Sequence, residues 1–332
     1  MTRTVLIDDA VSTANMIALL RRKAECGADL HLDSRLIQAG DVFVACPGIS
    51  GDGRDYVQQA IDRGAAAVLI HVDRAESWSE MDLRVPAMGV VGLLDRLGEL
   101  GDLWYASPSA SLQVVAITGT NGKTSCVQWL ADALSYLGKK VGVIGTLGIR
   151  FPDGKIQPGM LTTPDVLSVH RVLAALLHAG AQVVAIEASS IGLEQGRLNG
   201  VRIQRAAFTN LSRDHLDYHT SMAEYEAAKA ALFVSPELQS RHINLDDDAG
   251  RRIGSGLKEP FVGFSLSQPA SAVDLVAQEI VMDTRGVCFT LVHGAISVVV
   301  KSRLFGLHNV SNLLCVASIL LSMGWELKKI AS

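Results

Sequence analysis

The stretch VVAITGTNGKT, residues 114–124, decides the fold of this chain. Four apolar residues run into a glycine-rich turn that ends in Gly122-Lys123-Thr124, and residues 125–137 then have the pattern of a helix. A buried strand, a bare loop and a helix N-terminus together form an anion cradle, because backbone N–H groups point inward and the helix dipole favours negative charge. The stretch therefore predicts a phosphate-binding loop.

Within this loop, Lys123 would supply a positive charge for the β- and γ-phosphates of a nucleotide, and Thr124 a hydroxyl group for Mg²⁺. The usual pattern is Gly-x4-Gly-Lys, but position 117 is Ile, and the spacing here is Gly-x2-Gly-Lys-Thr. The alternative is a glycine turn followed by a chance Lys-Thr pair. The strand before the turn and the helix after it favour the phosphate loop.

Length and composition bound the remaining possibilities. The chain has 332 residues, which predicts two or three domains, and 48% of them are hydrophobic, which is ample for a core. The net charge of −4 argues against a general nucleic-acid or membrane-surface binder. No apolar run is long enough to span a membrane, and no signal peptide is evident. Five scattered cysteines predict reduced thiols, so we expect a cytoplasmic protein without a disulfide frame or zinc site.

Two regions with different patterns follow along the chain. In the first, the spacing predicts a helix over 11–24, strands over 42–45 and 65–72 with a short helix over 56–63 between them, and a helix over 90–105. Ser107-Pro108-Ser109 marks a domain boundary. We therefore predict a small N-terminal α/β domain over residues 1–107 and a central domain over 108–332.

In the central domain, strands and helices alternate. We predict strands over 113–117, 140–145, 182–187, 205–210 and 241–244, with helices over 124–137, 165–179 and 221–233. This alternation predicts an α/β fold with a mostly parallel sheet. Residues 273–300 instead predict added antiparallel hairpins, followed by a helix over 306–323.

Polar candidates follow three of the predicted strands, in the stretches 118–124, 187–190 and 210–215. Because sites in parallel sheets lie at the carboxyl ends of strands, we expect these stretches to share one crevice. Glu187 ends an apolar strand, where a carboxylate is costly unless it is paired or binds a metal. It is either a helix cap or an ion-pair partner or, as we favour, a Mg²⁺ ligand. His215, flanked by acidic residues, is the stronger second ligand candidate and His219 the weaker.

The sequence pattern alone does not decide the roles of two basic residues. Lys229 stands inside an apolar helix, and its pattern favours a surface lysine whose stem lies along apolar neighbours. Arg197 has a guanidinium suited to a carboxylate or a phosphate, but its spacing does not distinguish that role from a surface position.

At these residues the chain resembles the Mur ligases, which are ATP-dependent amide-forming enzymes of peptidoglycan assembly, and within them most closely the UDP-N-acetylmuramoyl-tripeptide synthetases. The shared segments run through the whole chain: Asp33-Ser34-Arg35, 40–45, Asp52-Gly53-Arg54, 119–124, Thr162-Thr163-Pro164, 187–190, Gln195-x-Arg197, 214–219, Ala228-Lys229, and Gly306-x-His308-Asn309-x2-Asn312. The six-residue phosphate loop is shared with the folylpolyglutamate synthetases. The segments at 33–35 and 214–219 favour the tripeptide enzymes.

The resemblance implies a role for each matching residue. ATP would be bound by Gly119, Thr120, Asn121, Gly122, Lys123, Thr124 and Ser125, with Asn309 and Asn312 near the adenine. The UDP end of the substrate UDP-MurNAc-L-Ala-D-Glu would be held by Leu32, Ser34, Ile49, Ser50 and Gly51. Its muramoyl-dipeptide end would be held by Thr162, Thr163, Ser189, Gln195 and Arg197. Mg²⁺ would be bound by Thr124, Glu187, His215 and Lys229, and catalysis would involve Lys123, Lys229, Glu187 and His215.

For Lys229 the resemblance reverses the surface interpretation. The matching lysine of the family is carbamylated to N6-carboxylysine, a change that turns a cation into a metal-binding anion. The second substrate implied is a diamino acid, with meso-diaminopimelate favoured over L-lysine. Other enzymes of peptidoglycan synthesis are expected partners, and the protein is expected to be a monomer.

The family has a third, C-terminal domain that binds the incoming amino acid. We expect the present chain to lack that domain and to be a truncated form, which bears on its activity. Two alternatives stay open: a folylpolyglutamate-type ligase, and a non-catalytic fragment that binds the UDP-muramoyl peptide or a partner protein.

Overall fold

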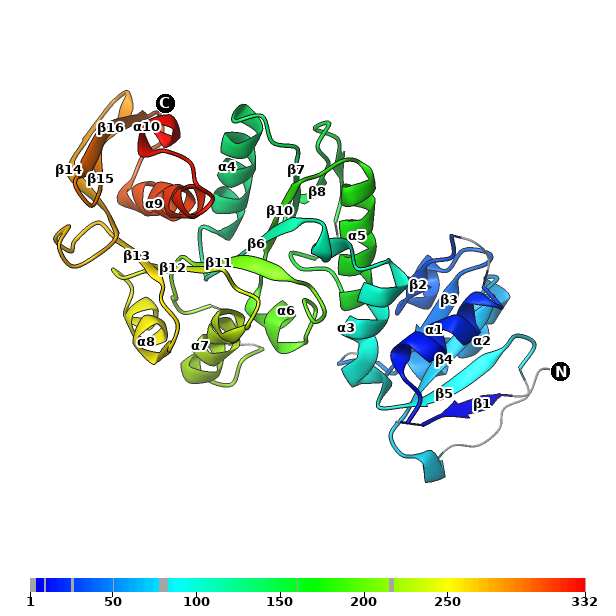
Figure 1. Ribbon diagram of the computed structural model, residues 1–332. Coiled ribbons are helices and arrows are strands. Elements are labelled where there is room, and N and C mark those ends of the chain that lie inside the picture. The colour runs from blue at the N-terminus through cyan, green and yellow to red at the C-terminus, as the bar shows by residue number, and fades with distance from the viewer. Residues whose placement is uncertain are drawn as a thin grey trace. The chain divides into compact units, whose positions relative to one another are not determined.

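The computed structural model describes residues 4–8, 10–24, 27–49, 51–77, 83–159, 161–214 and 218–331 (Figure 1). It divides into two compact units. Unit 1 comprises residues 1–108, 165–175 and 196–201, and unit 2 comprises 109–164, 176–195 and 202–332. Unit 1 thus contains two segments that lie beyond the predicted boundary in the sequence.

Unit 1 is built on a parallel sheet with strand order β1-β5-β4-β3-β2 among its described residues. The strands are β1 (Val5–Ile7), β2 (Leu30–His31), β3 (Val42–Ala45), β4 (Ala67–Val72) and β5 (Ala87–Val91). The helices are α1 (Thr13–Arg21), α2 (Val57–Asp62) and α3 (Leu93–Trp104). The predicted strands over 42–45 and 65–72 and the helices over 11–24 and 56–63 are confirmed within a few residues.

Alternation along β3 shows how this sheet is covered on both faces. Val42 and Val44 pack in the cluster that contains residues of α1 and α3, whereas Phe43 and Ala45 pack in the cluster that contains residues of α2. Side chains of successive strand residues point to opposite faces, so an unbroken apolar strand needs a cover on each side.

The single helix predicted over 90–105 is wrong at its start. Residues 87–91 form β5, and α3 begins only at Leu93, after Gly92 turns the chain with a φ of 64°. The apolar run across this junction has a helical spacing, and the local pattern did not reveal the pairing of β5 with β4 and β1.

Unit 2 is built on a larger mixed sheet with strand order β16-β15-β14-β13-β12-β11-β6-β10-β7-β8-β9. From β14 to β7 all neighbours are parallel, and the two ends of the sheet are antiparallel. The parallel strands are β6 (Gln113–Thr118), β7 (Val141–Gly145), β10 (Val183–Glu187), β11 (Ile203–Phe208), β12 (Ser240–Asn244), β13 (Val262–Ser265) and β14 (Leu275–Asp283). The remaining strands are β8 (Gly148–Arg150), β9 (Ile156–Gln157), β15 (Gly286–His293) and β16 (Ile296–Ser302).

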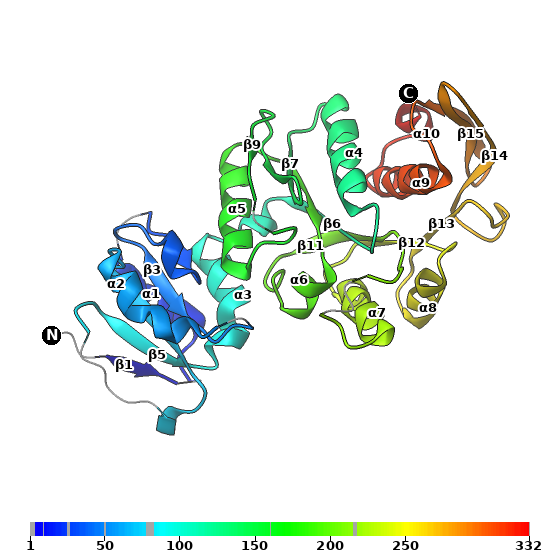
Figure 2. The same ribbon diagram turned by 180° about the vertical axis from the view of Figure 1, so that it is seen from behind.

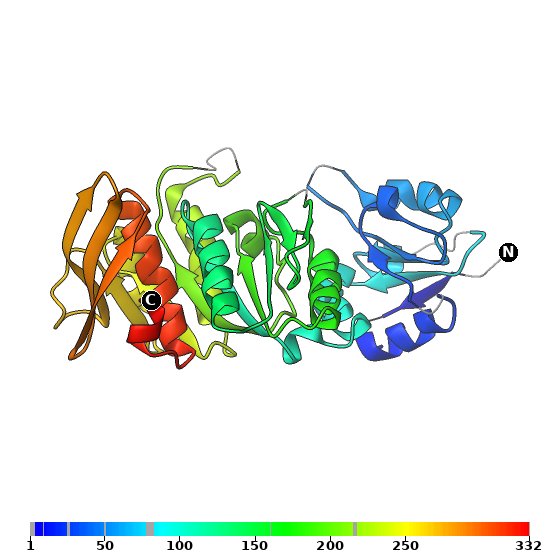
Figure 3. The ribbon, with the colours of Figure 1, turned by 90° about the horizontal axis from the view of Figure 1, so that it is seen from above.

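Helices lie on both faces of this sheet. They are α4 (Lys123–Tyr136), α6 (Ser190–Glu194), α7 (Met222–Ala230), α8 (Asp248–Gly256), α9 (Leu307–Ser322) and α10 (Leu327–Ile330), while α5 (Val166–His178) begins in unit 1 and ends in unit 2. Helices α4 and α9 lie on one side and α6, α7 and α8 on the other, as the two opposite views show (Figures 1 and 2). Seen from above, α9 lies beside the hairpin strands β14–β16 (Figure 3), and Leu314 of α9 shares a core cluster with Phe289 of β15.

The α/β class, the mostly parallel sheet and the added hairpins are confirmed. The unit 2 elements that were not predicted include α8 and β13, which lie between β12 and the hairpins, and the short elements β8, β9 and α6. Among the described residues, no helix is both long and apolar enough to cross a membrane.

Candidate functional site

The predicted phosphate loop joins β6 to α4 and depends on two glycines. Gly119 and Gly122 have φ angles of 145° and 86°, which side chains other than glycine rarely adopt. A Cβ on Gly119 would overlap Thr209 Oγ1, and one on Gly122 would overlap Asn312 Oδ1. The loop therefore needs glycine at both positions for backbone conformation and for close packing.

The first turn of α4 has no side-chain cap. Its N-cap residue is Gly122, which has no side-chain hydrogen-bond acceptor, whereas Ser221 caps α7 and Asp247 caps α8. The first N–H groups of a helix need acceptors from outside the helix, and an anion is a suitable one. This arrangement fits a bound phosphate group.

Two lysine amines converge on this loop. Lys123 Nζ donates to Gly119 O at 2.8 Å and to Thr120 O at 2.9 Å, and Lys229 Nζ donates to the same Gly119 O at 3.0 Å. Burial lowers the pKa of Lys123. Burial, and secondly the positive charge of Lys123, lower the pKa of Lys229 to about 7.

The surface position that the pattern favoured for Lys229 is wrong. Lys229 is 1% exposed, and its Nζ lies 4.3 Å from the centroid of the Tyr225 ring. In place of water, the buried amine of Lys229 contacts a carbonyl oxygen, through a hydrogen bond, and the face of an aromatic ring. Helical spacing alone did not reveal that this face of α7 points at the phosphate loop.

Glu187 lies at the end of β10, the strand beside β6, and it is completely buried. Its carboxylate accepts hydrogen bonds from Thr124 Oγ1 at 2.9 Å, Thr146 N at 2.9 Å and Thr146 Oγ1 at 3.1 Å. These donors are neutral groups, and the charged group that interacts with Glu187 is Lys123, so the donors themselves do not balance a negative charge on Glu187. A divalent cation next to Glu187 and Thr124 would supply that balance, and Mg²⁺ prefers such oxygen ligands.

The other predicted metal ligands are incompletely defined. In the part of the chain that the structure describes, no group of three or more His, Cys, Asp or Glu side chains is placed to hold a metal ion. His215 lies outside the described residues. His219, the weaker candidate, is buried, with Nε2 at 2.9 Å from Ser190 Oγ and Nδ1 at 3.1 Å from Glu194 Oε2. Both of its ring nitrogens thus have side-chain partners.

Three residues predicted to hold the muramoyl-dipeptide end surround Glu187. Thr146 Oγ1 lies 3.1 Å from Thr162 Oγ1, and Thr163 Oγ1 donates to the backbone oxygen of Glu187 at 2.7 Å. Thr163 Oγ1 also lies 3.0 Å from Ser189 Oγ. Residues far apart in the sequence are therefore connected by one hydrogen-bond network at the ends of β7 and β10.

The remaining predicted substrate residues are dispersed over both units. Gln195, in unit 2, donates from Nε2 to the Tyr218 hydroxyl at 3.1 Å. Arg197 is half-buried in unit 1.

The predicted UDP-binding residues also lie in unit 1. Leu32 is partly buried in its core, and Ser34 Oγ donates to Gln59 Oε1 at 2.6 Å. Ile49 is 74% exposed, and Gly51 O accepts from Gly48 N at 2.9 Å. Ser50 lies outside the described residues.

The two asparagines predicted near the adenine lie in the first turns of α9. Asn312 packs against Gly122, and its backbone oxygen accepts from Cys126 Sγ at 3.7 Å. Asn309 is half-buried and donates from Nδ2 to Phe305 O at 2.8 Å. Ser125 is half-buried in the first turn of α4.

Two residues of the site, Thr146 and Tyr225, were not predicted, and a third, Asn210, was predicted only as part of the strand-end stretch 210–215. Thr146 holds both oxygens of Glu187, the Tyr225 hydroxyl lies 3.1 Å from Thr120 Oγ1, and Asn210 holds Asn121. Asn210 falls in a predicted strand-end stretch, which was a usable signal. For Thr146 and Tyr225 the sequence offered no comparable signal, since each lies within an ordinary turn or helix pattern.

Two family models match the chain. The Mur ligase middle domain matches residues 117–320, and the Mur ligase family catalytic domain matches residues 29–103. The first match contains the phosphate loop, Glu187 and Lys229, and the second contains most of unit 1.

Individual relatives agree with these matches. Proteins named UDP-N-acetylmuramoyl-L-alanyl-D-glutamate--2,6-diaminopimelate ligase, from Pseudomonas putida and Pseudomonas syringae pv. tomato, are 42% and 45% identical to 91% of this chain. The aligned regions are 62% and 61% of those relatives. A solved structure of a ligase of that name has a TM-score of 0.76 and 30% identity, over 91% of this chain and 61% of its own. The chain thus spans about three fifths of the length of these relatives.

Proposed function

The chain belongs to the Mur ligase family, and we propose that it acts as an ATP-dependent amide ligase that adds a diamino acid to UDP-MurNAc-L-Ala-D-Glu. The observation that carries this proposal is the junction of Lys123, Thr124 and Glu187 at the ends of β6 and β10. The names of the relatives favour meso-diaminopimelate over L-lysine as the amino acid.

The proposed reaction has two steps. In the first, the γ-carboxylate oxygen of D-Glu attacks the γ-phosphorus of ATP, ADP leaves, and an acyl phosphate forms. In the second, the amine of the diamino acid attacks the acyl carbon, inorganic phosphate leaves, and the amine nitrogen loses a proton. Each bond that forms is matched by one that breaks, and ATP supplies the driving force.

The residues of the loop would act by binding and positioning. Backbone N–H groups of 119–124 and the N-terminus of α4 would bind the phosphates, and Lys123 would turn from the loop carbonyls to the transferred group. Mg²⁺ would be held by Thr124 and Glu187, and when bound it would offset phosphate charge. A backbone cradle of this kind would hold the phosphates in a fixed position for the reaction.

We further propose that Lys229 is carbamylated. An uncharged amine adds to CO₂ and releases a proton, and the product is an anion. Burial against Gly119 O and the Tyr225 ring supports the proposal, because an anion bound to a metal there would replace a buried cation that lies beside the charge of Lys123. The lowered pKa of Lys229 leaves part of the amine uncharged near neutral pH.

Other parts of the proposal rest on the family resemblance. Leu32, Ser34, Ile49, Ser50 and Gly51 would bind the UDP end, Thr162, Thr163, Ser189, Gln195 and Arg197 the peptide end, and Asn309 and Asn312 the adenine. His215 would be a further Mg²⁺ ligand. We propose a cytoplasmic, monomeric protein that works alongside other enzymes of peptidoglycan synthesis.

A product assay tests the function. The protein is incubated with ATP, Mg²⁺ and UDP-MurNAc-L-Ala-D-Glu, together with either meso-diaminopimelate or L-lysine. The masses of the products are then measured by mass spectrometry. We expect the tripeptide product with meso-diaminopimelate. In a parallel incubation with ATP, Mg²⁺, reduced folate and glutamate, a product would support the folylpolyglutamate-type alternative. Tight binding of the UDP substrate without any product would support the non-catalytic alternative.

A further inference from the structure

The phosphate loop is held from the side by the segment 209–212, which follows β11. Thr120 N donates to Asn210 O at 2.8 Å, and Asn121 N donates to Asn210 Oδ1 at 3.0 Å. Asn210 Nδ2 returns a bond to Asn121 O at 3.1 Å, and Thr209 Oγ1 donates to the same oxygen at 2.6 Å. Ser212 N donates to Thr120 Oγ1 at 3.0 Å. The segment therefore fixes the middle of the loop through both its backbone and its side chains.

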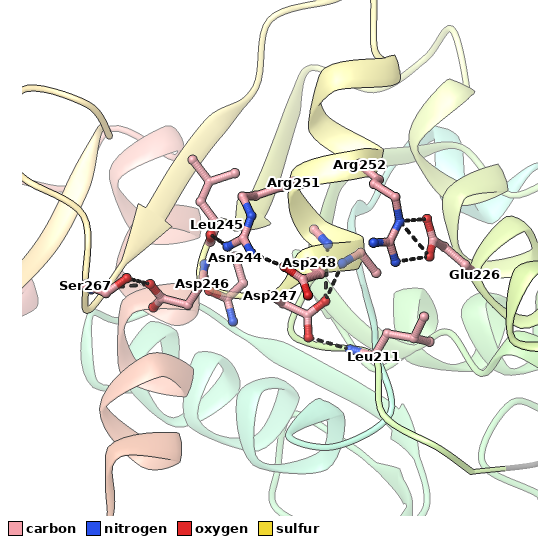
Figure 4. A network of polar contacts seen from close by, with 12 residues as sticks. Leu211, Glu226, Asn244, Leu245, Asp246, Asp247, Asp248, Arg251, Arg252 and Ser267 are labelled. Carbon is pink, nitrogen blue, oxygen red and sulfur yellow. Dashed lines mark hydrogen bonds and ion pairs between the residues drawn. The ribbon is translucent and has the colours of Figure 1, made fainter.

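That segment is itself held by a carboxylate that no sequence motif indicated. Asp247 Oδ2 accepts from Leu211 N at 3.0 Å, and its other oxygen, Oδ1, accepts from Ala249 N at 2.9 Å and Gly250 N at 3.2 Å (Figure 4). One oxygen thus caps α8, and the other binds the residue between Asn210 and Ser212. Asp247 joins the N-terminus of α8 to the segment that holds the phosphate loop.

The anchor behind Asp247 is rigid. A Cβ on Gly250 would overlap Asn244 O, so the first turn of α8 lies directly against the end of β12. Asn244 reinforces the link, since its Nδ2 donates to Thr209 O at 2.7 Å and its Oδ1 accepts from Asp246 N at 3.0 Å. Movement of Asp247 relative to segment 209–212 would break bonds at both ends.

We propose that Asp247 is a positioning residue for nucleotide binding, acting through Leu211 and the segment 209–212 on the phosphate loop. This inference rests on the proposed function, because it takes the loop to be the ATP-phosphate site. Hydrogen bonds to an ionised acceptor are among the stronger ones in proteins. A loop that must present several N–H groups to a phosphate gains affinity when it is already ordered before binding.

The alternative role for Asp247 is to cap α8 and nothing else. Substitution by serine separates the two roles. Serine is a good N-cap residue, so Asp247→Ser keeps an acceptor for the first turn of α8. It loses the second oxygen, which accepts from Leu211 N. Asp248→Ser is the matched control, because Asp248 is exposed and pairs with Arg251 on the surface of the same helix.

The test measures binding of Mg·ATP by calorimetry and exchange of backbone amide hydrogens in the unchanged chain and each variant. We expect Asp247→Ser to raise the Kd for Mg·ATP by about tenfold or more, the size expected for one charged hydrogen bond. We expect faster amide exchange at Thr120 and Asn121 without nucleotide. Asp248→Ser should stay within about twofold of the unchanged chain in both measurements.

The outcomes separate this inference from the function it rests on. If the unchanged chain does not bind Mg·ATP, the proposed function fails, and the inference fails with it. If the chain binds but Asp247→Ser leaves both the Kd and the amide exchange unchanged, Asp247 only caps α8. If Asp247→Ser does not fold, Asp247→Asn replaces it in the same test. A Kd for Mg·ATP equal to that of the unchanged chain would then overturn the inference.

Discussion

The amine groups of Lys123 and Lys229 donate to the same carbonyl oxygen, that of Gly119, at 2.8 Å and 3.0 Å. The two residues come from different helices, α4 and α7, and from positions more than a hundred residues apart in the sequence. Two like charges at one acceptor repel, and the positive charge of Lys123 accordingly contributes to the lowered pKa of Lys229. Phosphate binding and carbamylation would each relieve this repulsion, by adding negative charge to the same place.

Replacement of Lys123 by alanine tests the phosphate loop. We expect Lys123→Ala to weaken Mg·ATP binding by at least about a hundredfold, which corresponds to about 2.7 kcal/mol, and to abolish ligation. Lys258→Ala, a change at an exposed lysine after α8, is the control and should bind like the unchanged chain. Near-normal turnover by Lys123→Ala would remove the basis for assigning this loop to ATP.

Carbamylation of Lys229 is tested by isotope labelling. The protein is equilibrated with ¹³C-bicarbonate, and a carbamate carbon signal is sought by NMR. We expect one signal that is absent in Lys229→Met, a variant of similar side-chain length without an amine, and present in Lys258→Ala. A spectrum in which the unchanged protein and Lys229→Met are the same would show that Lys229 is not carbamylated.

Glu187 tests the proposed Mg²⁺ site. Glu187→Gln keeps the size of the side chain but cannot balance a cation, so we expect nucleotide binding to lose most of its dependence on Mg²⁺. We also expect a loss of about 1–3 kcal/mol in unfolding free energy, because the Gln amide group would face Thr124 or Thr146 donors. Glu237→Gln, at an exposed position, is the control. A titration with Mg²⁺ at fixed ATP decides, and an unchanged Mg²⁺ dependence would exclude Glu187 as a ligand.

His242 gives a prediction for stability as a function of pH. Complete burial, and secondly the charge of Arg205, lower the pKa of His242 from 6.5 to about 3. Below pH 6.5 the unfolded chain binds a proton that the folded chain does not, so stability falls as pH decreases toward 3. This histidine contributes a slope of up to about 1.36 kcal/mol per pH unit in that window.

We therefore expect His242→Gln to lose less unfolding free energy than the unchanged chain between about pH 7.5 and about pH 5. His178→Gln changes an exposed histidine of α5 and should keep the original pH dependence. Denaturant unfolding at both pH values measures the difference. Equal slopes for the unchanged chain and His242→Gln would mean that His242 titrates similarly in the folded and unfolded states.

Much of unit 2 could be predicted from the sequence because its elements alternate with clear signals. The apolar residues before Gly119 and the periodic ones after Lys123 define β6 and α4. The short strand β13 carries little pattern of its own, since Gly263 interrupts it, and it depends on pairing with β12 and β14. Between β5 and α3, an apolar run with a helical spacing concealed a turn at Gly92.

The site was less predictable than the fold because its contacts are long-range. Periodicity placed Lys229 on a helix but could not show that its face meets Gly119. Asp247 and Leu211 are 36 residues apart, and each has an ordinary local role. The family resemblance supplied Lys229, whereas Asp247 emerged only from the three-dimensional arrangement.

In the proposed reaction, this chain activates the D-Glu carboxylate of UDP-MurNAc-L-Ala-D-Glu with ATP. The most direct test is to incubate the protein with ATP, Mg²⁺, the UDP substrate and hydroxylamine, and to measure the hydroxamate and ADP formed. An acyl phosphate reacts with hydroxylamine, so we expect equal amounts of hydroxamate and ADP, both dependent on the UDP substrate and both lost in Lys123→Ala. ADP formation without hydroxamate, or independent of the UDP substrate, would contradict the proposed reaction.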